Sequence, residues 1–211
     1  MSNVTVYGMA QSVYTQIVLL VLDEKKVAYD LQETNVFSDQ TVSNIGKLNP
    51  FKKIPVLLHN NFKLYETSAI TRYIDETFPG ASLQPSDTQE RARMHQIIAL
   101  LDAHAYTPMI WGLFVQLVAL PQQGKDSDIS IIEGALHKTS ICLDALTNLI
   151  SKQVFLASSQ LSLADLHAFP ILYHLSLTSK GATQLSNHLG ISNWLEAMAT
   201  RLSIQNITLV K

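Results

Sequence analysis

The stretch NPFKKIPVL, residues 49–57, places a turn and two lysines directly before an apolar run. Asn49 and Pro50 favour a turn, and Pro55 lacks the N–H that a sheet ladder needs, so it belongs at the start or the edge of a strand. The residue before a proline is extended, which would let the backbone of Ile54 pair with an extended peptide as an added strand. The alternative is that Pro55 merely begins a strand.

Outward from this stretch, strand and helix patterns alternate over the first 79 residues. Short β-branched runs predict strands, and apolar residues at helical spacing predict amphipathic helices. Lysines at the end of the first helix suit its dipole. The expected order is β-α-β-α-β-β-α, with a strand at Val4–Gly8, a helix at Ser12–Lys26, a strand at Val27–Thr34, a loop with a short helix over 35–47, two strands around Asn60–Asn61 and a helix at Thr67–Phe78.

The remainder of the chain is predicted to be helical. Residues 80–88 are rich in turn formers and are interpreted as a linker between a domain over 1–79 and an all-helical domain over 89–211. Ser86 with Gln89, and Ser162 with Asp165, have the spacing of capping boxes that open helices. Pro108 should kink or break the long helix that begins near residue 88. The predicted fold class is therefore a small α/β domain followed by an all-α domain.

Composition excludes several classes of partner. The 211 residues are 47% hydrophobic and 15% charged, with a formal net charge of −2. Because the chain has no basic block, nucleic acid is not an expected partner, and no apolar run has the length of a membrane span. Cys142 is the only cysteine, so no intrachain disulfide can form. The histidines lack chelating spacing, so no metal is expected, and without a targeting leader the expected location is cytoplasmic.

Several polar residues stand where an ionic ligand could be held. Glu66 can bind an ammonium, and the free N–H groups behind Thr67, a candidate N-cap, can bind a carboxylate. Lys53 can meet a second carboxylate. Ser12 heads the first helix, where its hydroxyl can donate to an anion. The alternatives are ordinary ones: two helix caps, a solvated acid and a surface lysine.

Together these motifs resemble the glutathione S-transferase family. NPFKKIPVL is similar to the family's NPFGKIPVL, LYETSAITRYI (Leu64–Ile74) to its LFESRAITRYI, and LSLADL (Leu161–Leu166) to the capping box of its second domain. The resemblance covers essentially the whole chain. It implies a thioredoxin-like, glutathione-binding domain followed by an all-α domain with an electrophile site. The opening Val6–Asp30 is most similar to the serine-type classes, phi and theta.

The resemblance implies roles for individual residues. Ser12 would donate a hydrogen bond to the glutathione sulfur, with Tyr7 as the rival donor, and Cys142 lies too far along the chain for a cysteine-type enzyme. Ile54 would pair with the cysteinyl backbone, followed by a cis peptide bond. The implied glutathione-binding residues, from the glycyl to the γ-glutamyl end, are Lys53, Ile54, Pro55, Glu66 and Thr67.

The chain departs from the family pattern around the glycyl end. Lys52 stands where the family motif has glycine, which implies either a different turn or an added charge. Gln40 and Thr41 stand near the place where phi enzymes often have a histidine and a lysine for the glycyl carboxylate. Thr67 replaces the usual serine and keeps the hydroxyl. Lys52 or Lys53 is expected to supply the missing charge.

The implied activity is conjugation of glutathione to small hydrophobic electrophiles, with glutathione-dependent peroxide reduction as a further possibility. The alternatives are a non-catalytic carrier of hydrophobic ligands or conjugates, and a glutathione-dependent isomerase. The resemblance also implies a homodimer, with Phe51, Tyr73 and the helix of Arg91 and Met94 as contacts. The electrophile is expected between the domains, near Met9, Val13, Tyr106, Met109, Ile110 and Phe114.

Overall fold

The computed structural model describes residues 3–37, 45–150 and 154–207. It divides into two compact units, one made of the chain up to Ser82 together with the residues from Arg201 on, the other of Leu83–Thr200. The boundary at Ser82 falls inside the linker predicted over 80–88. The return of the chain to the first unit at Arg201 was not predicted, since 89–211 was expected to form one helical domain.

The first unit is built on a four-stranded sheet in the order β2-β1-β3-β4. Strand β1 runs parallel to β2 and antiparallel to β3, and β3 runs antiparallel to β4. Helix α1 and helix α3 pack against one another in this unit. The strands are β1 Val4–Gly8, β2 Asp30–Glu33, β3 Val56–His59 and β4 Phe62–Tyr65, and the helices are α1 Val13–Glu24 and α3 Thr67–Thr77, with a further helical turn over 45–48.

The end of α1 is fixed by a buried lysine. Lys25 follows the last residue of α1, and its Nζ lies 3.0 Å from Oδ1 of Asp75 near the end of α3. The same ammonium donates to the carbonyl oxygens of Asp75 and Ala81. Its side chain is 2% exposed. The lysine that was expected to complement the α1 dipole therefore ties the two helices and the following chain together.

The residues from Arg201 on belong to the first unit, and two of them bind Glu24 at the end of α1. Arg201 donates to both carboxylate oxygens of Glu24, at 3.1 and 3.0 Å, and the Ser203 hydroxyl donates to Glu24 as well. Such a two-pronged, charge-assisted contact has defined geometry. It precedes the short helix α10, Leu202–Asn206, which packs on α1. This contact joins residues far apart in sequence, and no local pattern announces it.

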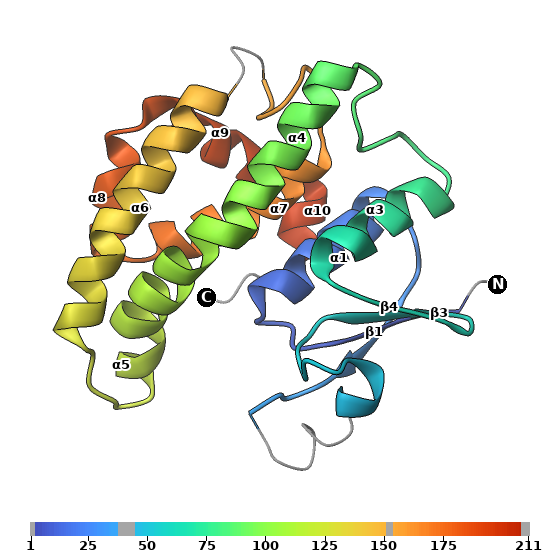
Figure 1. The fold of residues 1–211 in the computed structure, drawn as a ribbon, viewed down its shortest axis with the longest axis horizontal. Helices are drawn as coiled ribbons and strands as arrows, with labels where there is room; N and C mark the ends of the chain where they lie inside the picture. The colour runs from blue at the N-terminus through green and yellow to red at the C-terminus, as the bar shows by residue number, and fades with distance from the viewer. Residues whose placement is uncertain (1–2, 38–44, 151–153, 208–211) are drawn as a thin grey trace. The chain divides into compact units, whose positions relative to one another are not determined.

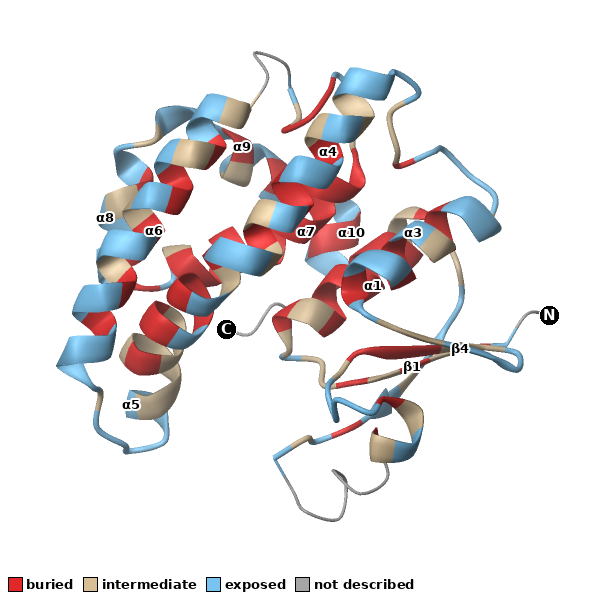
Figure 2. Ribbon diagram, viewed as in Figure 1, coloured by how far each residue is buried: buried red, intermediate tan, exposed pale blue. Residues whose placement is uncertain are grey.

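The second unit is an all-helical bundle around α7, Leu163–Ser176. Twelve of its fourteen residues are buried, and Figure 2 shows this helix buried along its length. The predicted capping box is confirmed, with Ser162 at the N-cap and Asp165 at the third position. The helices around α7 are α4 Thr88–Leu100, α5 Leu120–Gln122, α6 Ile129–Leu149, α8 Ser179–Ser186 and α9 Leu189–Ala199, with two π-helical segments, η1 Leu101–Ala105 and η2 Thr107–Ala119.

The long helix of this unit begins differently from its prediction but bends where the prediction placed the break. Its N-cap is Asp87, whose carboxylate accepts from the N–H groups of Gln89 and Glu90, so the capping box at Ser86 is wrong. The predicted break is confirmed: the axis bends by 48° between Ala105 and Thr107. Both sides of the bend are π-helical, and Pro108, which cannot donate an N–H to the preceding turn, lies at the start of η2 directly after the bend.

No single helix in the described ranges has both the length and the hydropathy of a membrane span. The two helices on either side of the bend, Thr88–Ala105 and Thr107–Gln122, have the length and composition of a span only when they are counted together.

Candidate active site

The sheet register gathers three predicted site segments at one end of the first unit's strands. Tyr7 of β1 is paired with Val56 of β3, and Val56 is paired with Tyr65 of β4. Because β3 runs antiparallel to both neighbours, the chain leaves β1, enters β3 and leaves β4 at the same end. Ser12 lies in the segment after β1, Ile54 and Pro55 lie in the segment before β3, and Glu66 and Thr67 lie directly after β4.

Ser12 occupies the N-cap position of α1 without acting as a side-chain cap. Its backbone is extended, with φ −72° and ψ 123°, and its hydroxyl makes no hydrogen bond to the N–H groups of the first turn. The Ser12 N–H instead closes a turn onto the carbonyl oxygen of Met9 at 2.9 Å. The side chain is half-buried. The hydroxyl therefore stands at a helix N-terminus with its hydrogen available to an anion.

Gly8 allows this helix to begin so close to the sheet. A Cβ atom at Gly8 would lie 2.5 Å from Oγ1 and 2.7 Å from Cγ2 of Thr15 on α1. Both distances are shorter than real Cβ contacts, so any other residue would push α1 and Ser12 away from the strand. The glycine thus fixes the approach of Ser12 to the end of β1.

Asn49 holds the turn in NPFKKIPVL. Its side chain accepts from the Phe51 N–H at 3.0 Å and donates to the carbonyl oxygen of Lys53 at 2.9 Å. Lys52 has φ 55°, in the left-handed region that glycine adopts most easily. The substitution in the family motif therefore leaves a left-handed turn in place and adds an exposed ammonium.

The backbone after this turn has the form that the resemblance implies. The Ile54–Pro55 peptide bond is cis, and Val56 begins β3 immediately afterwards. Ile54 is half-buried, and its backbone N–H and C=O make no hydrogen bond to any residue that the structure describes. Its N–H and C=O can therefore pair with an extended peptide that lies against the end of the sheet.

Glu66 has the strained backbone of the site. Its φ of 72° lies in the left-handed region, which is rare for a residue other than glycine and concentrates at functional positions. Glu66 is the N-cap of α3, and Thr67, predicted as the N-cap, is the first helical residue and is buried. The exposed carboxylate of Glu66 and the N–H groups of the first turn of α3 thus stand together.

The remaining glutathione-related residues differ in exposure. Lys53 is exposed beside the turn. Tyr7 is half-buried near the end of β1, on the opposite face of that strand from Val4 and Val6. Gln40 and Thr41, the replacements for the usual glycyl-carboxylate ligands, lie outside the described residues.

The residues expected around the electrophile come from both units. Met9, half-buried, and Val13, 4% exposed, flank Ser12 in the first unit. In the second unit Met109 is fully buried and Ile110 is 5% exposed, so both pack within the bundle. The other two expected residues of the second unit, Tyr106 and Phe114, are half-buried.

Tyr106 and Phe114 each contact a residue of the second unit. Burial raises the pKa of Tyr106, and a hydrogen bond with Trp111 opposes that rise. The partners are five residues apart, close to one π-helical turn. The ring of Phe114 meets that of His174 edge to face, with centroids 4.7 Å apart. Met94, expected at a dimer contact, is fully buried inside this unit.

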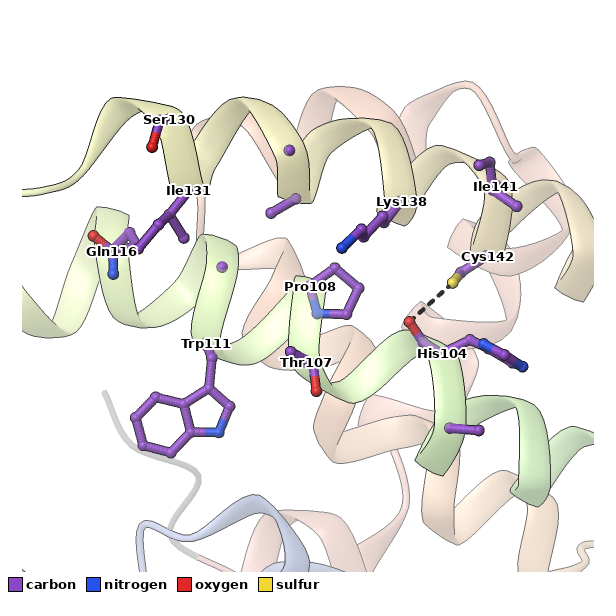
Figure 3. A pocket seen from close by; sticks show the side chains of 14 residues that line it. His104, Thr107, Pro108, Trp111, Gln116, Ser130, Ile131, Lys138, Ile141 and Cys142 are labelled. Atoms are coloured by element: carbon purple, nitrogen blue, oxygen red, sulfur yellow. Dashed lines mark hydrogen bonds between the residues drawn. The ribbon is translucent and has the colours of Figure 1, made fainter.

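A surface groove of about 960 Å³ lies within the second unit, between η1 and η2 on one side and α6 on the other. Figure 3 shows Lys138 extending over Pro108, with Cys142 and His104 at one end. Trp111 and Ile141 are 46% and 55% exposed along its rim. None of the residues predicted around the electrophile lines this groove, so it is separate from them.

Two residues beside the loop before Ser12 were not singled out from the sequence. Gln16 and Glu33 both bind that loop. Asn49 was expected only as a turn former, and its side chain also binds the carbonyl oxygen of Lys53 before Ile54. A glutamine among the buried residues of α1 was the available signal, since buried polar groups need a partner. Glu33 lies in a polar segment, where nothing local distinguishes it.

Within the described ranges, no three histidine, cysteine, aspartate or glutamate side chains are grouped as metal ligands. The expectation that the protein needs no metal stays an expectation.

Comparisons with known proteins agree across both units. Residues 6–82 match the family model described as glutathione S-transferase, N-terminal domain, and residues 106–201 match the corresponding C-terminal domain. The chain is 29% identical over 198 residues to glutathione S-transferase F13 of Arabidopsis thaliana, spanning 92% of this chain and 90% of the relative. It is 31% identical over 193 residues to F14 of the same plant, spanning 87% of this chain and 74% of F14.

A solved structure extends the likeness to three dimensions. Glutathione transferase F7 from Populus trichocarpa superposes with a TM-score of 0.85 at 27% identity, covering 99% of this chain and all of the poplar chain.

Proposed function

The chain belongs to the glutathione S-transferase family, and on that premise we propose that it conjugates the glutathione thiolate to small hydrophobic electrophiles, with Ser12 as the hydrogen-bond donor to the sulfur. The observation that carries this proposal is the unused hydroxyl of Ser12. It stands at the N-terminus of α1 and caps no N–H of that helix. The hydroxyl oxygen of a serine that served only as a helix cap would accept a hydrogen bond from an N–H group of the first turn.

The energetic demand on this hydroxyl is modest. A free thiol with a pKa near 8.5 is only about 3% thiolate at pH 7, and attack on an electrophile needs the thiolate. Lowering that pKa by about two units requires about 2.7 kcal/mol of preferential stabilisation of the anion. A hydrogen bond to a charged atom supplies about 1.5–3 kcal/mol. The N-terminus of α1 adds about 0.3–1 kcal/mol.

The rest of the tripeptide fits the same end of the sheet. Ile54 offers its backbone to the cysteinyl residue, as an antiparallel strand partner. The γ-glutamyl ammonium pairs with Glu66, and its carboxylate meets the Thr67 hydroxyl and the free N–H groups of α3. The glycyl carboxylate lies toward Lys53, and the ammonium of Lys52 adds positive charge where the family motif has glycine.

In the first unit, the electrophile would lie over the sulfur near Met9 and Val13, which stand on either side of Ser12 in the sequence. The thioether of Met9 and the side chain of Val13 suit an adaptable apolar site. In the second unit, Met109 and Ile110 are buried within the bundle, which leaves Tyr106 and Phe114 as the half-buried candidates there.

The conjugation assay with glutathione and a generic aromatic halide tests the role of Ser12. We expect Ser12→Ala to lower kcat/KM at least about tenfold, which corresponds to about 1.4 kcal/mol of barrier, while Ser12→Thr keeps more activity because it keeps the hydroxyl. Tyr7→Phe is the matched control, since it removes the hydroxyl of the rival donor, and we expect it to stay within about twofold of the parent.

The outcomes separate the alternatives. Loss of activity in Tyr7→Phe with none in Ser12→Ala would move the donor to Tyr7. A parent that binds glutathione in calorimetry but conjugates no electrophile would favour the carrier.

We also propose that the protein is a cytoplasmic homodimer in which Phe51 enters the partner. Phe51 is 64% exposed, and its ring touches only the edge of Tyr65 among the described aromatic rings, with centroids 6.2 Å apart. An exposed aromatic ring on a fixed turn suits a contact with a second chain. Light scattering should give twice the chain mass for the parent and a smaller mass for Phe51→Ser. A monomeric parent would contradict the proposal.

A further inference from the structure

Gln16 is a polar residue in an apolar helix interior. It is fully buried on α1, between residues such as Thr15 and Ile17 that are buried as well. Its Nε2 donates to the carbonyl oxygen of Ala10 at 3.1 Å, while its Oε1 is buried and has no hydrogen-bond partner within the described ranges. Burying a half-satisfied amide costs free energy that an apolar side chain would not. The bond to Ala10 is therefore what this side chain contributes.

That bond acts on the loop that carries Ser12. Ala10 lies two residues before Ser12, inside the turn closed by the Ser12 N–H and the Met9 carbonyl. The N–H of Ala10 donates to Oε2 of Glu33 at 3.3 Å. The backbone N–H and C=O of Ala10 are therefore both hydrogen-bonded to side chains. The Glu33 contact is exposed, and the Gln16 contact is part-buried. Gln16 is thus the sheltered one of the two supports.

We propose that Gln16 is a positioning residue for Ser12: it fixes the loop so that the hydroxyl meets the glutathione sulfur at hydrogen-bond distance. This inference rests on the proposed role of Ser12 as the thiolate donor. A hydrogen bond weakens steeply with distance and angle, and misplacement of a reacting group by about 1 Å can cost about 100-fold in rate. Gln16 acts only through the loop and has no contact with substrate in the proposal.

Gln16→Met tests the proposal, because methionine has similar length and flexibility but cannot donate to Ala10. We expect kcat/KM with glutathione and an aromatic halide to fall about tenfold, mostly in kcat, and the pKa of bound glutathione to rise toward its free value. Thr139→Val is the matched control: it removes a hydroxyl on α6 of the second unit that is likewise fully buried without a partner in the described ranges. Its activity should stay within about twofold of the parent.

A double-mutant cycle with Ser12→Ala separates positioning from general damage. If Gln16 works through Ser12, Gln16→Met should change kcat/KM less than about twofold once Ser12 is alanine. An equal loss in both backgrounds, or no loss in the parent background, would overturn the proposal. Thermal unfolding of each variant, with Gln16→Leu as a second replacement, identifies any variant that is merely unfolded.

The test also distinguishes a failure of the proposed role of Ser12 from a failure of the proposed role of Gln16. If Ser12→Ala alone leaves activity unchanged, the proposed role of Ser12 fails and the positioning role of Gln16 fails with it. If Ser12→Ala is impaired and Gln16→Met is not, only the role of Gln16 fails.

Discussion

The thiol of Cys142 on α6 donates a hydrogen bond to the carbonyl oxygen of His104, with Sγ 3.3 Å from that oxygen (Figure 3). His104 lies four residues before Pro108, so the N–H that would bind its carbonyl in an α-helix does not exist. Burial raises the pKa of the Cys142 thiol, which keeps its proton at neutral pH. The only cysteine of the chain thus supports the bend in the long helix of the second unit.

Cys142→Val should therefore destabilise the protein. Valine fills a similar volume but cannot donate, so we expect the free energy of unfolding in urea to fall by about 0.5–1 kcal/mol, the contribution of a weak hydrogen bond such as S–H to oxygen. Ile141→Val, at the exposed neighbouring position, should change it by less than about 0.5 kcal/mol. Equal stability of Cys142→Val and the parent would contradict this role of the thiol.

The buried pair of Lys25 and Asp75 makes a larger prediction. Lys25→Met leaves a buried carboxylate without its cation, and we expect a loss of about 3–5 kcal/mol in the free energy of unfolding. Adding Asp75→Leu should recover part of that loss, because no uncompensated charge remains. Lys26→Met, at the exposed next position, is the control and should be nearly neutral. A double variant less stable than Lys25→Met would refute this explanation.

The backbone of Lys52 predicts a stabilising substitution. A residue with a Cβ in the left-handed region costs about 1–2 kcal/mol relative to the right-handed form, whereas glycine adopts it freely at an entropic cost of about 0.5–1 kcal/mol. Lys52→Gly should therefore raise the free energy of unfolding by about 0.5–1 kcal/mol. Lys53→Gly, whose φ is not positive, should lower it instead. The same sign for both variants in chemical denaturation would contradict the argument.

His167 predicts acid sensitivity. Complete burial on α7 lowers its pKa to about 3, from an ordinary value near 6.5. The unfolded chain then binds a proton that the folded chain does not, so stability rises with pH between about 3 and 6.5 and is lost as the pH falls through that window. At pH 5 the loss is about 2 kcal/mol relative to pH 7.5. Burial also lowers the pKa of His174, which acts in the same direction.

His167→Phe removes this titration, so its urea midpoint should fall less between pH 7.5 and pH 5 than that of the parent. The exposed His137 provides the control variant His137→Phe, which should keep the pH dependence of the parent. An unchanged pH dependence in His167→Phe would contradict the assignment.

Local patterns predicted most of the fold. The hairpin around Asn60–Asn61, the break near Pro108 and the Ser162–Asp165 capping box each depend on neighbours in sequence, and the structure contains all three. The N-cap at Asp87 was missed because Ser86 beside it suits the same motif. The return of residues from Arg201 to the first unit depends on Glu24, about 180 positions away, and no local rule connects them.

The candidate site was predicted in parts. The motif around Pro55 located the edge where a peptide can pair, because proline restricts its own position in a sheet. The strained φ of Glu66 and the uncapped hydroxyl of Ser12 could not be predicted, since backbone angles at helix starts are set by tertiary packing. Gln16 shows the same limit, because a glutamine in an apolar helix signals a partner without naming it.

The measurement that tests the central claim most directly is the ultraviolet titration of the glutathione thiol bound to the protein, in the parent and in Ser12→Ala. We predict that the bound thiol of the parent ionises about two pH units below its free pKa of about 8.5, and that Ser12→Ala returns it most of the way to the free value. The same lowered pKa in both proteins would contradict the claim that Ser12 stabilises the thiolate.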